Sequence, residues 1–369
     1  MLKRFEVENF RGFNQRMVFD MTAGSYEFNQ GVVYNGLVKN AIVYGKNGSG
    51  KSSLGAALFD IVSTLTDKKK ISSAYILPYT NLNNTNRMAQ FKYVFVFAGK
   101  EIEYSYSRLS PDEIVREQLY IDGETVIDFD RSENGQRFVK KELVGDLNLE
   151  IHDDQLSVVK YIRNNIPVNQ LAPEFVDLVN FAEHMLWYRS LSDGNSYAGY
   201  KNGSERIEEV LYKQGKLVEL QNFLARFGLK YNLFFDEDDS AQKLYVRFPG
   251  GRRAPFYSVV STGTRALTLF FYWSTLAFQD VSLIFIDEFD AFFHYEAAEE
   301  IARRLNLKPS YQSVITSHNT YLMKNDLTRP DCCYIMSANR ITPLCKATDR
   351  VIREAHNLEK MYVNGVFVE

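Results

Sequence analysis

The stretch that decides the fold is Gly45-Lys46-Asn47-Gly48-Ser49-Gly50-Lys51-Ser52, which fits the phosphate-loop pattern G-x-x-x-x-G-K-[ST] at every fixed position. Residues 41–44 form a short apolar run typical of a buried strand, and residues 53–62 have the spacing of a helix. In such a turn the backbone N–H groups and the helix N-terminus face a phosphate. A chance match is the alternative, but strand, loop and helix in this order favour a nucleoside triphosphate site.

The roles within this loop follow from the chemistry of its side chains. We predict that Lys51 reaches the β and γ phosphates and that the Ser52 hydroxyl binds Mg²⁺. The predicted nucleotide contacts are the glycines, the small polar residues and the first residues of the helix: Gly45, Asn47, Gly48, Ser49, Gly50, Lys51, Ser52 and Ser53.

The composition is that of a globular chain. Of the 369 residues, 45% are hydrophobic and 24% are charged, which predicts a full core and excludes global disorder. The net charge of −3 provides no overall basic field, so any contact with nucleic acid must come from a local patch. The aromatic content of 14%, mostly Phe and Tyr, favours a core built with strands.

Three features bear on where the protein works. Cys332, Cys333 and Cys345 are odd in number and lack metal-ligand spacing, which predicts reduced thiols. The first residues start a strand pattern and lack the apolar stretch of a signal peptide. The apolar run at 281–286 is too short to span a bilayer. We therefore expect a cytoplasmic protein that does not enter a membrane.

Strand patterns dominate the first third of the chain. Residues 2–10 and 16–20 alternate apolar and polar side chains, as a strand with one buried face does, and a third strand is expected near 31–34. Between residues 91 and 130, four further strands are separated by turn residues, of which Asp122-Gly123 is the strongest hairpin signal. This part predicts an antiparallel meander, distinct from the parallel sheet of the phosphate loop.

The middle of the chain is helical by its spacing. Helices are predicted at 157–164, 173–187 and 204–227, with a glycine-containing break at 192–196. The predicted fold class is α/β, with a mostly parallel phosphate-loop sheet, an N-terminal antiparallel β subdomain and a helical subdomain. The expected units are an N-terminal lobe at 1–133, a helical insertion at 134–256 and a C-terminal lobe at 257–369.

Two charged runs each have two interpretations. Lys68, Lys69 and Lys70 could contact phosphates, or they could be solvated lysines at the end of a helix. The acidic run 236–239 could hold a metal ion, but it lacks the alternation of a Ca²⁺ loop and is typical of a solvated turn.

A second apolar strand, at 282–286, ends in the carboxylates Asp287 and Glu288. In phosphate-loop enzymes an Asp at this place binds Mg²⁺ together with the loop Ser, so we predict Asp287 as a metal ligand. Glu288 is placed to polarise a water for in-line attack on the γ phosphate, a general-base role typically worth about two to four powers of ten in rate. The alternative is a strand that merely ends in exposed acids.

His318 follows another strand pattern, at 313–317. Open parallel sheets bind ligands at the carboxyl ends of their strands, so His318 is a candidate to sense or stabilise the γ phosphate. A structural histidine is the alternative. With Glu288 and Lys51, His318 completes the predicted catalytic set.

A second anion-binding turn is predicted at Ser261 and Gly263, directly before an apolar helix at 266–278. One triphosphate does not need two such loops from one chain. The arrangement makes sense if each chain of a homodimer offers this turn to the nucleotide of its neighbour. An ordinary capped helix is the alternative.

Together these motifs resemble the ATP-binding cassette class of ATPases, in the branch that includes SMC, RecF and OLD proteins. The Walker A, Walker B, catalytic glutamate and switch histidine motifs match at Gly45, Gly50, Lys51, Ser52, Asp287, Glu288 and His318. The opening Asn-Phe-Arg-Gly-Phe at 9–13 resembles the N-F-[KR]-x-[FI] element of that branch. The ending at 358–367 is similar to that of stand-alone bacterial AAA family ATPases of the abortive-infection type.

This chain departs from the family pattern at two places, and its Q-loop glutamine has three candidates. The signature Leu-Ser-Gly-Gly-Gln reads Val-Ser-Thr-Gly-Thr at 260–264, a degenerate form that resembles the OLD-like branch rather than transporters. The segment after Glu288 reads Phe-Asp-Ala-Phe-Phe-His instead of Ser-Ala-Leu-Asp. The Q-loop glutamine could be Gln90, Gln155 or Gln170.

The resemblance implies ATP and Mg²⁺ as cofactors and hydrolysis of ATP in a nucleotide-sandwiched homodimer. It also implies a switch in bacterial anti-phage defence that controls a separate toxic effector, commonly a nuclease. The alternative is a RecF-like DNA-binding ATPase, whose basic candidates would be Lys68–Lys70, Lys140-Lys141 and Arg252-Arg253. A third alternative is a ribonuclease site at Arg350, Arg353, Glu354 and His356, although we expect these to be surface charges on one C-terminal helix.

Overall fold

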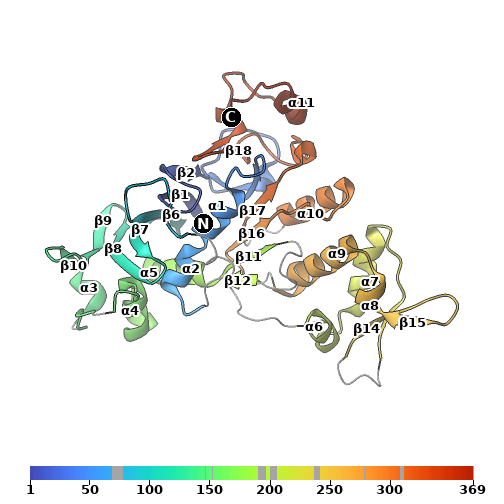
Figure 1. The fold of residues 1–369 in the computed structure, drawn as a ribbon, viewed down its shortest axis with the longest axis horizontal. Helices are drawn as coiled ribbons and strands as arrows, with labels where there is room; N and C mark the ends of the chain where they lie inside the picture. The colour runs from blue at the N-terminus through green and yellow to red at the C-terminus, as the bar shows by residue number, and fades with distance from the viewer. Residues whose placement is uncertain are drawn as a thin grey trace.

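Two seven-stranded sheets form the body of the molecule (Figure 1). The computed structural model describes residues 1–68, 78–145, 147–151, 153–189, 197–199, 206–236, 242–277, 280–307 and 311–368. The α/β class predicted from the sequence is confirmed, with one sheet mostly parallel and the other antiparallel.

The mostly parallel sheet has the strand order β12-β11-β16-β17-β5-β18-β19. Its strands are β5 (Asn40–Tyr44), β11 (Met185–Arg189), β12 (Tyr197–Gly199), β16 (Leu283–Asp287), β17 (Gln312–Ser317), β18 (Cys333–Ser337) and β19 (Arg340–Pro343). The five inner strands are parallel, and β12 and β19 add antiparallel edges. Every residue of β5, β16 and β17 is buried, as expected of strands covered on both faces.

The antiparallel sheet has the order β10-β9-β8-β7-β6-β1-β2. Its strands are β1 (Leu2–Glu8), β2 (Met17–Asp20), β6 (Ala89–Phe97), β7 (Lys100–Ser110), β8 (Glu113–Ile121), β9 (Glu124–Asp130) and β10 (Arg137–Val139). The predicted meander is therefore confirmed. At its β8–β9 turn Asp122 and Gly123 have φ values of 48° and 78°, the left-handed pair that a tight hairpin turn requires.

The remaining elements are short. Two small sheets contain β3 (Val33–Tyr34) with β4 (Leu37–Val38), and β13 (Leu233–Phe235) with β14 (Leu244–Arg247) and β15 (Arg253–Pro255). The helices are α1 (Lys51–Leu58), α2 (Asp60–Leu65), α3 (Lys141–Val144), α4 (Val158–Asn165), α5 (Pro173–Glu183), α6 (Ile207–Lys213), α7 (Leu217–Arg226), α8 (Phe256–Val259), α9 (Thr262–Tyr272), α10 (Tyr295–Leu307) and α11 (Leu358–Val363). Single turns are η1 (Gln30–Val32), η3 (Val168–Gln170), η4 (Trp273–Ala277), η5 (Thr320–Leu322) and η6 (Leu344–Lys346).

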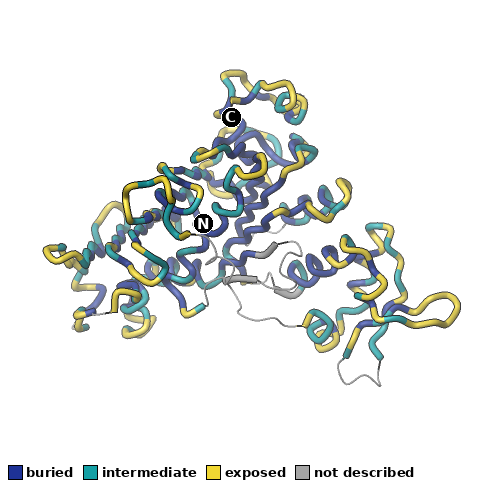
Figure 2. The backbone as a smooth tube through the Cα atoms, viewed as in Figure 1, coloured by how far each residue is buried: buried dark blue, intermediate teal, exposed yellow. Residues whose placement is uncertain are grey.

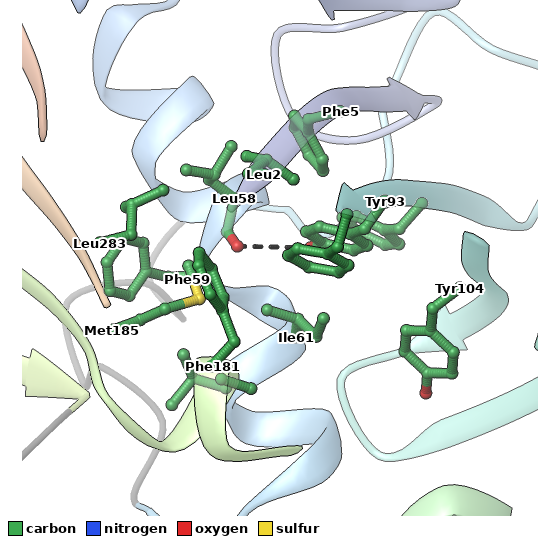
Figure 3. Packing of buried hydrophobic residues seen from close by; sticks show 14 of the residues in the cluster. Leu2, Phe5, Leu58, Phe59, Ile61, Tyr93, Tyr104, Phe181, Met185 and Leu283 are labelled. Carbon is green, nitrogen blue, oxygen red and sulfur yellow. Dashed lines mark hydrogen bonds between the residues drawn. The ribbon is translucent and has the colours of Figure 1, made fainter. Parts of the chain in front are cut away.

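Helix α1 lies between the two large sheets (Figure 1). On one side, Gly55 packs so closely on β16 that a Cβ there would come 2.6 Å from the ring of Phe285. On the other side, the Tyr93 hydroxyl of β6 donates to the Ala57 carbonyl at 2.9 Å and reaches that of Leu58 at 3.4 Å (Figure 3). The helix is thus fixed from both sides, which also fixes the loop that precedes it.

The parallel sheet separates two apolar cores because successive residues of a strand point to opposite faces. On β5, Ala41 and Val43 belong to the core shared with α1, α2 and the antiparallel sheet. Ile42 and Tyr44 belong to the second core, which α7, α9 and α10 cover. Figure 2 shows the buried backbone concentrated along this central sheet.

The structure corrects two of the predicted helices. The helix expected at 173–187 ends at Glu183, and Met185–Arg189 forms β11, which pairs in parallel with β16. The helix expected at 204–227 is two helices, α6 and α7, separated at Gly215, whose φ of 64° is left-handed. The predicted break at 192–196 lies outside the described residues.

Two further helix predictions are also corrected. The helix expected at 53–62 is interrupted at Phe59, between α1 and α2. The residues Arg350, Arg353, Glu354 and His356 are exposed, as predicted, but they precede α11 and are not helical. In the described parts of the chain no helix is long and apolar enough to cross a bilayer.

Candidate functional site

The phosphate loop follows β5 and runs into α1, as the sequence predicts. Gly48 and Gly50 have φ values of 78° and 103°, which a side chain would strain. A Cβ on Gly45 would clash with Ser49 Oγ and lie 2.8 Å from the Met336 carbonyl of β18. The loop therefore needs glycine at these positions, for conformation at two of them and for space at the third.

The polar groups of the loop fit an anion. The Ser49 hydroxyl oxygen is buried and makes no hydrogen bond to any part of the chain that the structure describes. Asn47 and Gly48 are exposed, whereas Ser52 and Ser53 are half-buried in the first turn of α1. Buried polar atoms of folded proteins are normally paired, so an unpaired hydroxyl beside the N-terminus of α1 is consistent with a phosphate contact.

Lys51 is buried, with 6% of its surface exposed. Its Nζ donates to the carbonyls of Gly45, at 2.6 Å, and Lys46, at 3.1 Å, and lies 3.3 Å from Nδ1 of His318. An ammonium group donates only, so Nδ1 of His318 must be the acceptor, which places the ring proton on Nε2. The Nε2–H of this exposed imidazole is then the donor that a phosphate oxygen would meet.

The charges around Lys51 act in opposite directions on its pKa. Burial lowers the pKa of Lys51 below its ordinary value, while the carboxylates of Asp287, Glu288 and Asp290 raise it. Burial has the larger effect. The three carboxylates therefore lie close enough to offset part of the cost of burying the ammonium group.

Asp287 ends β16 and is fully buried. Its Oδ1 accepts a hydrogen bond from the Thr316 hydroxyl of β17, at 2.8 Å, and the same hydroxyl oxygen accepts from the Glu288 backbone N–H, at 2.9 Å. Glu288 is exposed, with a φ of 50°. Thr316 thus fixes both acidic residues from the neighbouring strand, a role that no motif in the sequence indicated.

The residues predicted to hold Mg²⁺ are chemically suited to it. Ser52 and Asp287 offer a hydroxyl and a carboxylate oxygen, and Mg²⁺ is usually bound by one or two carboxylates together with phosphates and water. Within the described residues no three His, Cys, Asp or Glu side chains are grouped as a self-sufficient metal site. The donor set therefore fits an ion that arrives with a nucleotide.

The N-terminal turn lies over the phosphate loop. A Cβ on Gly50 would lie 3.3 Å from the Phe13 ring, and one on Gly12 would lie 3.7 Å from Ser53 Oγ. Of the three candidate Q-loop glutamines, Gln90 pairs with Glu8 in the register of β6 and β1, next to this turn. The strand and turn patterns were predicted from the sequence, but their contact with the loop was not.

The predicted second anion turn opens helix α9. Ser261 caps α9, its Oγ accepting from the Thr264 N–H at 3.3 Å, and a Cβ on Gly263 would lie 3.0 Å from the Phe292 carbonyl. The turn therefore contacts the loop that follows Glu288. Helix α9 itself lies beside α7, apart from α1 (Figure 1).

Three basic residues of the charged runs are held in contacts within the chain, whereas Lys141 and Arg252 are exposed. Lys68 Nζ donates to the Glu183 carbonyl, Lys140 pairs with Glu124 at 2.6 Å, and Arg253 pairs with Asp236 at 2.9 Å. The other members of the two runs, 69–70 and 237–239, lie outside the described residues.

The strand–loop–helix unit, with an acidic strand two places away in the same parallel sheet, defines a nucleotide-binding α/β protein of the phosphate-loop class. The family described as "AAA domain, putative AbiEii toxin, Type IV TA system" matches residues 41–324. The chain belongs to this family of AAA ATPases. No curated protein matches the sequence.

Several solved structures resemble the chain. The SMC head domain from Thermotoga maritima is 16% identical, with a TM-score of 0.44 over 93% of this chain and 98% of that chain. An SMC head bound to the C-terminal winged-helix domain of ScpA is 15% identical, with a TM-score of 0.44 over 92% and 96%. The recombination mediator protein RecF of the RecFOR pathway is 15% identical, with a TM-score of 0.40 over 93% and 98%.

Proposed function

We propose that this chain hydrolyses ATP and acts, as a nucleotide-sandwiched homodimer, as the switch of an anti-phage defence system. One observation carries the proposal: Lys51, His318 and the Asp287-Glu288 pair meet at the carboxyl ends of β5, β17 and β16, three neighbouring strands of one parallel sheet. Open α/β sheets bind ligands at this edge.

In the proposed reaction the loop N–H groups and Lys51 hold the β and γ phosphates of the substrate ATP. Mg²⁺, bound by Ser52 and Asp287, would neutralise charge on the phosphates. Glu288 is exposed, so its carboxylate can accept a proton from an attacking water, and His318 donates from Nε2 to a γ-phosphate oxygen. The Thr316 hydroxyl holds the Asp287 carboxylate and the Glu288 backbone N–H in place through two hydrogen bonds.

The position of Ser261 and Gly263 supports a composite site. Because α9 lies apart from α1, this turn is better placed to serve the nucleotide of a second copy than that of its own chain. We assign Ser261 and Gly263 to the partner's nucleotide on this ground.

The family description names a toxin of a type IV toxin–antitoxin system, and the sequence shows no nuclease motif. We therefore place the toxic activity on a separate effector, a nuclease, under the control of the ATPase. The DNA-binding alternative has less support, because the net charge is −3 and two of its basic candidates, Lys140 and Arg253, are paired with carboxylates.

Glu288→Gln tests the catalytic part of the proposal. The amide keeps the shape of the side chain but cannot act as a base, so we expect ATP binding to persist while turnover falls by about two to four powers of ten. Light scattering with MgATP should then show a stable dimer. Wild-type turnover in this variant would overturn the assignment of Glu288.

Purification of the untagged chain together with the proteins encoded by adjacent genes tests the proposed role as a switch. A nuclease should be recovered with the ATPase, and its release or activity should change with ATP. Repeated recovery of the ATPase alone, together with DNA affinity that falls steeply with salt, would instead establish the DNA-binding alternative.

A further inference from the structure

The loop after β16 contains a buried carboxylate that none of the predicted motifs includes. Asp290 is 5% exposed, and its Oδ2 accepts three hydrogen bonds from the loop after β17. The donors are Ser317 Oγ at 2.7 Å, Asn319 Nδ2 at 2.8 Å and the Tyr321 hydroxyl at 2.8 Å. Burying a carboxylate is costly unless it is well satisfied, and three donors on one oxygen satisfy it.

The two loops that Asp290 joins hold the predicted catalytic residues. Glu288 lies two positions before Asp290, and His318 lies between Ser317 and Asn319. The two backbones are joined at the start of the loops, where the Phe289 N–H donates to the Thr316 carbonyl at 3.0 Å. Beyond that point, it is the Asp290 side chain that ties the two loops together.

The same loop touches the second anion turn. The Phe292 carbonyl lies where a Cβ on Gly263 would come within 3.0 Å, so the Ser261–Gly263 turn cannot move toward the loop without displacing it. One short loop thus contacts both neighbours, the Ser261–Gly263 turn through Phe292 and the loop of His318 through Asp290.

We propose that Asp290 is a positioning residue that sets the spacing of Glu288 and His318 and passes the position of the Ser261–Gly263 turn to both. This inference rests on the proposed ATPase function. The Lys51 ammonium group donates its hydrogen bonds to the Gly45 and Lys46 carbonyls, and Asp290 acts on it only through charge. We therefore expect Asp290 to affect the chemical step more than nucleotide affinity.

The test compares Asp290→Ala with Asp290→Asn in the full chain. The alanine variant leaves three donors unpaired, and we expect kcat to fall by roughly tenfold to a hundredfold, since misplacement of a catalytic group by about 1 Å has that scale. The Kd for MgATP should stay within about threefold. Asparagine keeps one oxygen acceptor, so its kcat should lie between that of alanine and that of the wild type.

Asp331→Asn is the matched control. Asp331 is also a buried carboxylate, 2% exposed, and it accepts hydrogen bonds from the Gly24 N–H at 2.6 Å and from Arg329. It precedes β18, at the sheet edge opposite the phosphate loop. This variant should lose thermal stability without losing kcat. If the Asp290 and Asp331 variants lose the same amount of kcat for each degree by which their melting temperature falls, the positioning role is overturned.

Hydrogen exchange separates this inference from the proposed function. In Asp290→Ala the peptides covering 288–293 and 316–321 should lose protection together, whether or not the wild type hydrolyses ATP. Loss of protection in 288–293 alone would overturn the connection between the loops. If the wild type has no ATPase activity but the two peptides still lose protection together in Asp290→Ala, the proposed function is refuted. The connection between the two loops through Asp290 is then still supported.

Discussion

Lys51 and His318, 267 positions apart in the chain, meet with their nitrogens 3.3 Å apart. The lysine begins α1 and the histidine follows β17, the strand that pairs directly with β5. The contact therefore depends on the order of strands in the parallel sheet. It also determines which nitrogen of His318 carries the proton.

The first prediction concerns this proton. His318 should be neutral with its proton on Nε2, because Lys51 can only donate to Nδ1. His184 is a natural control, since its Nδ1 lies 2.7 Å from the Asn180 carbonyl, an acceptor, and must carry the proton. Nitrogen NMR of ¹⁵N-histidine protein should show the two opposite tautomers. The same tautomer at both rings would contradict the assigned contact.

The second prediction concerns space in the phosphate loop. Gly45→Ala forces a methyl group against Ser49 and the Met336 carbonyl, so the free energy of unfolding should fall by about 1–3 kcal/mol. Stabilisation by MgATP in a thermal melt should disappear as well. Gly99→Ala, in a turn with a φ of 86° and no atom within 4 Å, should cost about 1 kcal/mol through backbone strain and keep the nucleotide response. Retained nucleotide stabilisation in Gly45→Ala would show that the loop is not the binding site.

The third prediction tests whether the Ser261 turn serves the neighbouring chain. Lys51→Ala and Ser261→Arg chains should each be inactive alone. In a mixed dimer one of the two composite sites contains neither change, so an equal mixture should recover roughly a quarter of wild-type activity. No recovery after verified subunit exchange would mean that the turn acts within its own chain.

Loss of a helix cap needs a separate control in that experiment, because Ser261 caps α9. Asn357 caps α11, accepting from the Lys360 N–H at 2.8 Å, far along the chain from the phosphate loop. Asn357→Ala should cost about 1 kcal/mol of stability and leave turnover unchanged.

The fourth prediction concerns pH. Hydrogen bonds from Lys324 and Arg303, at 2.7 and 2.8 Å, lower the pKa of Glu299 below its ordinary value of 4.5. A carboxyl with a lowered pKa in the folded state stabilises the protein above its unfolded pKa, and this contribution is lost as pH falls through the folded pKa. Glu299→Gln should therefore cost about 0.5–1 kcal/mol at pH 7, and the difference from wild type should shrink below pH 4.5.

Glu300→Gln serves as its control, because Glu300 lies on the same helix and pairs only with Arg304 among the ion pairs of the described residues. Denaturant unfolding at pH 7 and at pH 3 measures both variants. If Glu299→Gln lowers the free energy of unfolding by the same amount at both pH values, the effect of the substitution comes from packing and not from charge.

The parts of the site that could be predicted are those encoded locally. Gly45 to Ser52 and Asp287-Glu288 carry their chemistry in consecutive residues after apolar runs, so spacing alone was sufficient to find them. The roles assigned to Ser261 and Gly263 stay predictions, because they depend on a second chain.

The parts that could not be predicted depend on distant partners. Residues 185–189 continue an apolar pattern without a helix breaker, and only pairing with β16 makes them a strand. Thr316 and Asp290 gain their roles from hydrogen bonds between β16 and β17 and their loops, which the spacing of residues does not encode.

The left-handed backbone of Glu288 has a consequence for evolution and engineering. A φ of 50° is unfavourable for glutamate by about 1 kcal/mol and costs glycine nothing. Replacement by glycine would therefore relieve strain while removing the proposed base. Glycine also adds conformational entropy to the unfolded chain, which offsets about as much stability as the relieved strain provides. Selection for thermal stability alone would therefore not retain Glu288, and variants selected without a measurement of turnover can lose their activity at this position.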